Sequence, residues 1–182
     1  MAAEDVKLIG MWASPSVVTA RIALNLKGIE YELLKEDPCK KSELLLKSNP
    51  VYKKFPVLIH GGKRICKSHL IVEYIDQVWS SSGFPILPAD AYDRVTSIFW
   101  ATYIDDTLNS QIGELMLNED EKSKAETEEQ LFTALQLFEE TFVKSYKTKT
   151  PRLVEWAECF CSVKAAKKVL PKLKNWWSSG HF

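Results

Sequence analysis

The hydrophobic positions of the first eighty residues alternate between strand-like and helix-like spacing. A compact apolar run from Val6 to Trp12 predicts a buried strand, and Ile29–Lys35 predicts a second one. Two further short apolar segments, Val57–His60 and Lys63–Cys66, are separated only by Gly61-Gly62. Because a glycine pair favours the tightest hairpin turns, these two segments are expected to form an antiparallel hairpin.

Three helices are predicted between and after these strands. Ser14-Pro15 marks the start of the first, since serine is a preferred N-cap and proline is favoured at the first helical position. Gly28 suits the left-handed cap that ends a helix. Ser42–Lys47 predicts a short second helix, and Ser68 begins a third with one apolar face. The resulting order, βαβαββα, implies a parallel pair with a right-handed crossover followed by the hairpin.

Beyond residue 80 the chain changes character. Residues 80–90 (SSSGFPILPAD) have the composition of a linker. Apolar residues at spacings of three and four then predict helices over Tyr103–Leu115 and Leu131–Phe142, with a third beginning at Pro151. The expected fold class is therefore α+β followed by all-α, with a first domain, a linker and a helical domain at residues 1–80, 81–90 and 91–182.

Composition narrows the class of protein further. With 46% hydrophobic and 26% charged residues in 182, the chain can bury a sizeable core. Its 24 basic and 24 acidic residues cancel, so no global field attracts nucleic acid or anionic lipid. No segment has the length of a membrane-spanning helix or the pattern of a signal peptide, so a cytoplasmic protein is expected. Reduced thiols are expected for its cysteines, which form no C-x-x-C pair: Cys39, Cys66, Cys159 and Cys161.

Three features of the first domain point to one candidate site. Ser14 and Ser68 both lie where a strand turns into a helix, so hydroxyl and backbone N–H groups there can face a ligand. Phe55-Pro56 precedes the third predicted strand, and a cis bond there would turn the preceding backbone outward, toward an extended peptide. The alternative interpretation is that both serines are plain helix caps.

The charges around these residues are one-sided. Between residues 40 and 67 there are eight basic residues and one acid, Glu43. Such a cluster would attract a small ligand bearing a carboxylate, although a solvated basic face is the simpler interpretation for any single lysine. The basic residues are Lys40, Lys41, Lys47, Lys53, Lys54, Lys63, Arg64 and Lys67.

Several long segments carry a resemblance to a known family. They are WASPSVVTARIALNLKGIEYE from Trp12, KSELLLKSNPVYKKFPVLIH from Lys41, SHLIVEYID from Ser68 and ILPAD from Ile86. Together they closely resemble plant glutathione transferases of the tau class, over nearly all of residues 5–145 and again over 150–172. The resemblance implies a thioredoxin-like domain that binds glutathione and a helical domain that binds a hydrophobic electrophile. It also implies conjugation in detoxification and stress response, a homodimer, and no cofactor other than glutathione as co-substrate.

By position, the resemblance implies roles for individual residues. Ser14 would be the catalytic residue that hydrogen-bonds the glutathione sulfur, while Lys41 and Lys54 would bind the glycyl carboxylate. The backbone of Phe55, ahead of Pro56, would pair with the cysteinyl unit, and Ser68 would hold the γ-glutamyl carboxylate. Because the thiolate is the nucleophile and a free thiol has a pKa near 8.5, a hydroxyl donor beside a helix N-terminus suits this role.

Ser14 also separates two reactions within the wider family. Relatives that exchange thiols carry cysteine at this position, and serine cannot form the mixed disulfide. Conjugation is therefore favoured over reductase activity. For the electrophile pocket, Tyr103, Ile104 and Leu108 are candidates, although an apolar helix face of this kind is more often core.

Lys67 departs from the family pattern. The tau class has glutamate where this chain has Lys67, beside Ser68. At about 4 Å and an effective dielectric of 20 to 80, the attraction lost and the repulsion gained toward the ligand's ammonium are each roughly 1–4 kcal/mol. The hypothesis is that Lys67, while still lining the glutathione site, weakens glutathione binding.

A second departure concerns the helical domain. Roughly fifty residues of the family pattern are missing after Thr150, which runs straight into Pro151. A missing core helix would leave apolar faces, with Leu135, Phe138 and Trp156 as candidates. These two departures support an alternative function, a non-catalytic binder of hydrophobic ligands or of a partner subunit.

No metal site is expected. The histidines His60, His69 and His181 do not have the spacing of metal ligands. Cys159 and Cys161 lack a second pair of ligands and are expected to pack within a helix. Cys66 lies close to Ser68 in sequence, but a packed, inert thiol is the favoured interpretation.

Overall fold

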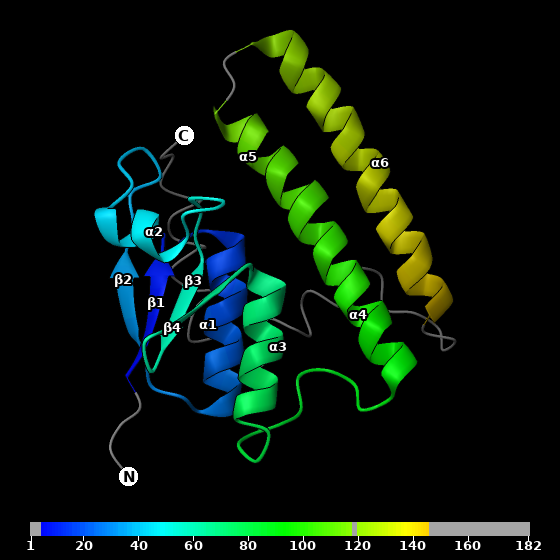
Figure 1. Cartoon of the computed structure of the whole chain (residues 1–182). Helices are drawn as coiled ribbons and strands as arrows, with labels where there is room; N and C mark the ends of the chain where they lie inside the picture. The colour runs from blue at the N-terminus through cyan, green and yellow to red at the C-terminus, as the bar shows by residue number, and fades with distance from the viewer. Residues whose placement is uncertain (1–4, 118–119, 146–182) are drawn as a thin grey trace. The chain divides into compact units, whose positions relative to one another are not determined.

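The computed structural model describes residues 5–117 and 120–145 (Figure 1). The chain divides into two compact units, Met1–Phe99 and Trp100–Phe182. The first contains a small mixed sheet with helices, and the described residues of the second are helical, so over the described residues the predicted order of an α+β region followed by an all-α region is confirmed.

The sheet of the first unit has four strands in the order β2-β1-β3-β4. They are β1 (Val6–Gly10), β2 (Glu32–Lys35), β3 (Val57–His60) and β4 (Lys63–Cys66). β1 pairs in parallel with β2 and antiparallel with β3, which pairs antiparallel with β4. The predicted parallel pair and the predicted hairpin are both present, and Gly61 and Gly62 form the turn with φ of 54° and 79°.

Two strands are shorter than their apolar runs predict, and each has a local cause. β1 ends at Gly10 because the next residues turn, with the Ser14 N–H donating to the Met11 carbonyl at 3.1 Å. β2 begins at Glu32 because Ile29 still belongs to the end of the preceding helix, where its N–H donates to the Leu24 carbonyl at 2.9 Å. The hydrophobic runs therefore predicted strands that were too long, the first extending into a turn and the second beginning within a helix cap.

Helices cover both faces of this sheet. α1 (Pro15–Lys27) and α3 (Ser68–Val78) lie side by side on one face, and α2 (Glu43–Ser48) lies on the other (Figure 1). Alternate strand residues point to the two faces. Leu8 and Leu58 pack with α1 and α3, whereas Ile9 and Val57 pack with Leu45 of α2.

The segment that follows α3 is fastened to it. Asp76 of α3 accepts hydrogen bonds from the backbone N–H groups of Ile86 and Leu87 at 2.9 and 3.1 Å. Arg94 lies 3.6 Å from Glu73 and 3.9 Å from Asp76. The first unit consequently extends to Phe99, past the boundary at residue 80 and the linker at 81–90 that the sequence suggested.

The second unit begins within one continuous helical segment. α4 (Ala91–Tyr103) passes into a π-helical turn, η1 (Ile104–Leu108), and then into α5 (Asn109–Leu117). α6 (Glu121–Ser145) follows, and its first turn is capped by Asp120, whose Oδ2 accepts from the Ser123 N–H at 2.9 Å. Within the described residues no helix is long and apolar enough to cross a membrane. The predicted helix from Pro151 and the proposed deletion after Thr150 lie outside the described residues.

Candidate functional site

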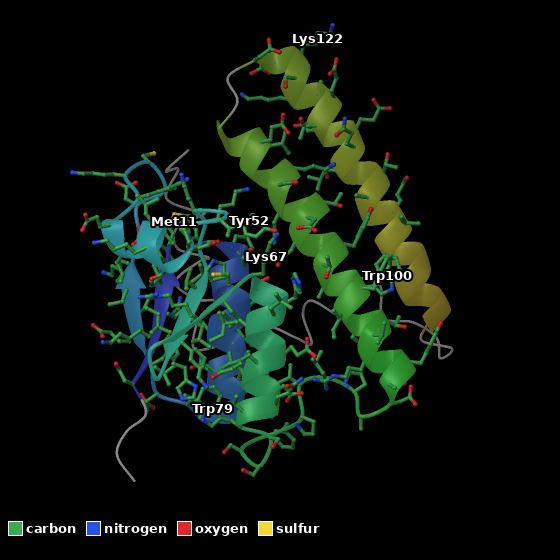
Figure 2. All side chains as sticks on the ribbon, viewed as in Figure 1. Met11, Tyr52, Lys67, Trp79, Trp100 and Lys122 are labelled. Atoms are coloured by element: carbon green, nitrogen blue, oxygen red, sulfur yellow. The ribbon has the colours of Figure 1, made fainter. Side chains whose placement is uncertain are left out.

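The strand register brings the predicted site residues to one end of the sheet. Ile9 of β1 pairs with Val57 of β3, which in turn pairs with Cys66 of β4. The residues that follow β1, precede β3 and follow β4 therefore emerge at the same edge. Figure 2 shows Met11, Tyr52 and Lys67 together at this edge, with Trp79 at the opposite end of the unit.

Ser14 is the N-cap of α1, with φ −65° and ψ 127°, and is 9% exposed. Its side chain makes no capping hydrogen bond. Ser42 behaves differently, because its hydroxyl accepts from the Leu45 N–H at 3.1 Å and caps α2. The plain-cap interpretation therefore fits Ser42 and not the Ser14 hydroxyl, which lies beside the positive end of the α1 dipole.

Arg21 fixes the turn that leads into Ser14. Its guanidinium donates to the Trp12 carbonyl at 3.4 Å and to the Tyr31 hydroxyl at 3.2 Å. The sequence analysis missed this positioning role. A single arginine on a mostly apolar helix was the available signal, but its partners lie nine and ten residues away.

Asn49 organises the loop that carries the next site residues. This buried side chain donates to the Lys54 carbonyl at 2.8 Å and accepts from the Tyr52 N–H at 3.1 Å. Its backbone carbonyl accepts from the Lys53 N–H at 2.8 Å. The Phe55-Pro56 bond that follows is cis. Sequence reasoning did not identify this role of Asn49.

The third helix begins at Ser68, as predicted. Its N-cap is Lys67, so the alternative interpretation of Ser68 as a plain cap is wrong. Lys67 has φ 73° and ψ 128°, a conformation that non-glycine residues rarely adopt and that is concentrated at functional sites. Its ammonium lies 4.9 Å from the centroid of the Tyr52 ring, a cation–π distance. Ser68 itself is buried, at the positive end of the α3 dipole.

The basic residues do not form a single cluster. Lys41 follows β2, which runs parallel to β1, and Lys54 precedes β3, so both exposed lysines are on the loops at the Ser14 end. Lys63 and Arg64 pair with His60 and Ile59 at the opposite end of the sheet. The hairpin separates them from the site, which the sequence spacing did not reveal.

Cys66 and His60, the other reactive side chains described here, contact neighbouring residues of the first unit. Burial raises the pKa of the Cys66 thiol, which lies 3.9 Å from the Ser48 carbonyl, so the thiolate is disfavoured as expected for an inert cysteine. His60 lies 2.9 Å from the Tyr74 hydroxyl, and its ring is 4.8 Å from that of Trp79. Among the described residues no group of three His, Cys, Asp or Glu could hold a metal ion. His181, Cys159 and Cys161 lie outside them.

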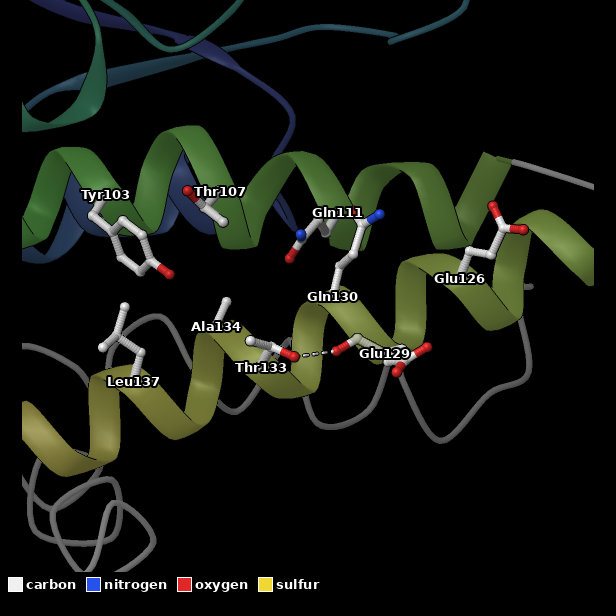
Figure 3. A pocket seen from close by; sticks show the side chains of 9 residues that line it. All are labelled: Tyr103, Thr107, Gln111, Glu126, Glu129, Gln130, Thr133, Ala134 and Leu137. Carbon is white, nitrogen blue, oxygen red and sulfur yellow. Dashed lines mark hydrogen bonds between the residues drawn. The ribbon is translucent and has the colours of Figure 1, made fainter.

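A groove of about 550 Å³ runs between the α4–η1–α5 segment and α6 of the second unit (Figure 3). Tyr103 lines it, whereas Ile104 does not, and the side chain of Leu108 is not among those described. The same is true of Leu135 and Phe138, predicted to be exposed apolar residues, and Trp156 lies outside the described residues. The lining residues are Tyr103, Thr107, Gln111, Glu126, Glu129, Gln130, Thr133, Ala134 and Leu137.

Comparison with known families and proteins identifies related chains. A family model described as glutathione S-transferase, N-terminal domain, matches residues 4–77. Glutathione S-transferase U18 of Arabidopsis thaliana is 42% identical, over 95% of this chain and 93% of its own. U17 of the same plant is also 42% identical, over 94% and 92%. The alignment with U18 runs over 211 residues, more than the 182 of this chain, so that relative contains residues without a counterpart here.

Solved structures give the same result. The tau-class glutathione S-transferase of mango, Mangifera indica, has 40% identity and a TM-score of 0.80, with 94% of each chain covered. Rice GST1, solved in complex with glutathione, has 36% identity and a TM-score of 0.64 over 74% of this chain and 62% of its own. The thioredoxin-like first unit, the long motifs and these similarities lead to one conclusion: the chain belongs to the tau class of the glutathione S-transferase family.

Proposed function

We propose that this protein is an enzyme that conjugates glutathione to hydrophobic electrophiles. The observation that carries the proposal is the meeting of Ser14, the Phe55-Pro56 segment and Ser68 at one edge of the sheet, fixed by the pairing of β1, β3 and β4. In the reaction, the glutathione thiolate attacks an electrophilic carbon. A carbon–sulfur bond forms, and the bond to the leaving group breaks with its electron pair.

Ser14 is the residue proposed to stabilise the thiolate. Its hydroxyl is not used in capping and stands at the positive end of α1, so both the O–H donor and the helix dipole favour a negative sulfur. Lowering a thiol pKa from about 8.5 by about 2 units takes roughly 2.7 kcal/mol, within reach of these two effects together. No side chain is needed as a general base, because the thiol ionises to solvent before the attack.

The tripeptide is proposed to be held by groups around that sulfur. Lys41 and Lys54, on exposed loops at the site edge, attract its glycyl carboxylate. The backbone of Phe55, ahead of Pro56, pairs with the cysteinyl unit as a strand would. Ser68 and the N-terminus of α3 bind the γ-glutamyl carboxylate.

The electrophile is proposed to bind through the helical unit, where Tyr103 lines a groove. We also propose that the protein is cytoplasmic and works as a homodimer. The pairing elements would be the helix holding Tyr103–Met116 and the helix holding Leu131–Phe142. Light scattering coupled to size exclusion tests that association directly.

The test begins with a calorimetric titration of glutathione into the full chain, followed by turnover of a chromogenic electrophile. Ser14→Ala should lower kcat/KM by about a hundredfold, the effect of removing one donor to a developing anion. Thr19→Ala is the matched control, since its exposed hydroxyl lies on the same helix and donates to the Pro15 carbonyl at 3.1 Å. This variant should keep wild-type activity.

Two results would count against the proposal. Full activity in Ser14→Ala would remove Ser14 as the partner of the thiolate. A folded chain that binds no glutathione would instead favour the non-catalytic binder.

A further inference from the structure

The loops at the site edge of the first unit present positive charge to a ligand. Lys41 and Lys54 lie on these loops and are exposed, as are Lys40 and Lys53 beside them. Lys67 adds another cation at the start of α3. The edge therefore favours negative groups on any ligand that it binds.

The acidic side chains of the same edge are held by their own segments. The Glu36 carboxylate accepts from the hydroxyl of Ser42 and, at 3.1 Å, from its N–H. Asp37 accepts from a backbone N–H two residues later at 2.8 Å, and the Glu43 carboxylate lies 3.2 Å from the Lys47 ammonium. Within the described part of the first unit, these three carboxylates are the acidic groups of the edge. A ligand ammonium therefore meets several cations there, and each of these carboxylates already has a partner.

Glutathione brings both signs of charge to this edge. In the binding mode proposed above, on which this inference rests, its glycyl carboxylate approaches Lys41 and Lys54, and its γ-glutamyl carboxylate approaches Ser68. The third charged group is the γ-glutamyl ammonium, which is attached to the same carbon atom as the γ-glutamyl carboxylate. Whenever that carboxylate is bound at the N-terminus of α3, the ammonium must consequently lie next to it.

Lys67 places a cation where this ammonium would lie. It is the N-cap of α3, directly before Ser68, and its own ammonium lies 4.9 Å from the centroid of the Tyr52 ring. Tyr52 belongs to the loop that leads to Phe55, and Figure 2 shows it together with Lys67 at the site edge. The cation–π contact thus holds the Lys67 charge between the segments proposed to bind the γ-glutamyl and cysteinyl units.

The backbone of α3 acts on the ligand in the same direction as Lys67. α3 has eleven residues, and its N-terminus, where Ser68 is buried, carries the positive end of the helix dipole. A ligand carboxylate is attracted by both the dipole and the lysine, whereas a ligand ammonium is repelled by both. Removing the ammonium while keeping the carboxylate is therefore the change in the ligand that should improve binding most.

We propose that Lys67 makes this site selective for a thiol peptide that has a carboxylate at each end and no ammonium. The chemical class is that of glutathione with the γ-glutamyl amine replaced by hydrogen. Lys41 and Lys54 attract one carboxylate of this ligand, and Lys67 with the N-terminus of α3 attracts the other. Lys67 thus determines specificity, while the reaction at sulfur is unchanged: the thiolate beside Ser14 forms the carbon–sulfur bond, and the leaving group departs with its electron pair.

Calorimetric titration of the full chain with two thiol peptides tests this selectivity. The probes are glutathione and glutaryl-cysteinylglycine, which lacks only the γ-glutamyl amine. The wild type should bind the amine-free peptide at least tenfold more tightly, since a factor of ten corresponds to about 1.4 kcal/mol, near the lower end of the repulsion between like charges at close range. In Lys67→Glu the preference should reverse. The ratio of the two Kd values should then change by about a hundredfold, because repulsion of the ammonium is replaced by attraction of similar size.

Two further variants make the test specific to the charge of Lys67. Lys63→Glu makes the same charge change at the opposite end of β4 and should keep the wild-type ratio of Kd values. Lys67→Gln removes the charge without reversing it and should give an intermediate ratio, also if Lys67→Glu does not fold. Because both peptides share the thiol and the glycyl carboxylate, a general loss of stability or affinity cancels in this ratio.

The outcomes separate this inference from the proposed function. Turnover of glutathione that depends on Ser14, with glutathione bound as tightly as the amine-free peptide or more tightly, would overturn the inference and leave the proposed function standing. The same ratio in wild type and Lys67→Glu would also overturn the inference, since Lys67 would then not act on the γ-glutamyl end. Binding of neither peptide by the folded chain would overturn both. Faster conjugation of the amine-free peptide than of glutathione, lost in Ser14→Ala, would support both.

Discussion

The ammonium of Lys27 lies 2.8 Å from the Oδ1 atom of Asp76, in an ion pair that joins α1 to α3. The two side chains are 0% and 8% exposed. Burial alone would raise the pKa of the Asp76 carboxyl, but the Lys27 ammonium and the N–H groups of Ile86 and Leu87 outweigh it and hold that pKa below its usual value. The Asp76 carboxylate thus links α1 to α3 and also binds the segment that follows α3.

Removing this carboxylate should strongly destabilise the first unit. Asp76→Asn keeps the shape of the side chain but leaves the Lys27 charge buried without a counter-charge, which typically costs about 3–5 kcal/mol. The free energy of unfolding in urea measures the loss. Glu73→Gln is the control, because its partially exposed contact with Arg94, at 3.6 Å, should contribute less than about 1 kcal/mol. Equal losses in the two variants would contradict the special role of Asp76.

The same carboxylate predicts a direction for the pH dependence of stability. A carboxyl whose pKa is lower in the folded state stabilises the protein above its unfolded pKa, about 3.9, and stops doing so as the pH falls through the folded value. The difference in unfolding free energy between wild type and Asp76→Asn should therefore be constant near neutrality and shrink below about pH 3.9. Unfolding curves over that range test it, and a difference that widens on acidification would contradict the pairing.

The order of strands and helices was predictable because its signals are local. Ser14-Pro15, Gly28 and the Gly61-Gly62 pair each act through the backbone conformation of one or two residues. The register of Ile9, Val57 and Cys66 is not local. It depends on how whole strands pack, and it is this register that assembles the site edge.

The candidate site residues were named from positions that a family resemblance supplied. The hydrogen bonds that support those residues could not be predicted in the same way. Arg21 and Asn49 act through hydrogen bonds to backbone atoms, whose partners are known only once the turns have formed. Lys63 and Arg64 were wrongly grouped with the basic residues of the site, because they are close to Lys67 in sequence. The chain direction of β4 places them at the far end of the sheet.

Asn49 should be needed for both stability and ligand binding. Asn49→Ala leaves the Tyr52 N–H and the Lys54 carbonyl without their side-chain partner, and each lost hydrogen bond typically costs about 0.5–1.5 kcal/mol. Because this loop carries Lys54 and Phe55, the Kd for glutathione should rise severalfold as well. Calorimetry and urea unfolding measure the two effects. Asn109→Ala, in the second unit, is the control: its loss of a bond to Asp105 should leave the glutathione Kd unchanged.

Lys67 should determine how tightly this site binds glutathione. The tau-class pattern has glutamate at this position, and the structure directs the Lys67 ammonium over the Tyr52 ring, 4.9 Å from its centroid. A cation at the N-terminus of α3 opposes the ammonium of the γ-glutamyl group while adding to the field that attracts its carboxylate. The repulsion between Lys67 and the ligand ammonium is about 1–4 kcal/mol at close range. It should exceed the attraction that one more positive charge beside the helix dipole adds toward the ligand carboxylate.

Lys67→Glu should accordingly lower the Kd for glutathione at least tenfold, since about 1.4 kcal/mol corresponds to a factor of ten. The expected gain exceeds the cation–π contact that is lost, because Tyr52 is 57% exposed and such contacts contribute about 0.5–1 kcal/mol at exposed sites. Lys63→Glu makes the same charge change at the opposite end of β4 and should alter the Kd little. Calorimetric titration of both variants with glutathione measures these Kd values. Equal affinities for Lys67→Glu and wild type would contradict the prediction, because they would show that the repulsion is screened and that the lysine over Tyr52 is compatible with full binding.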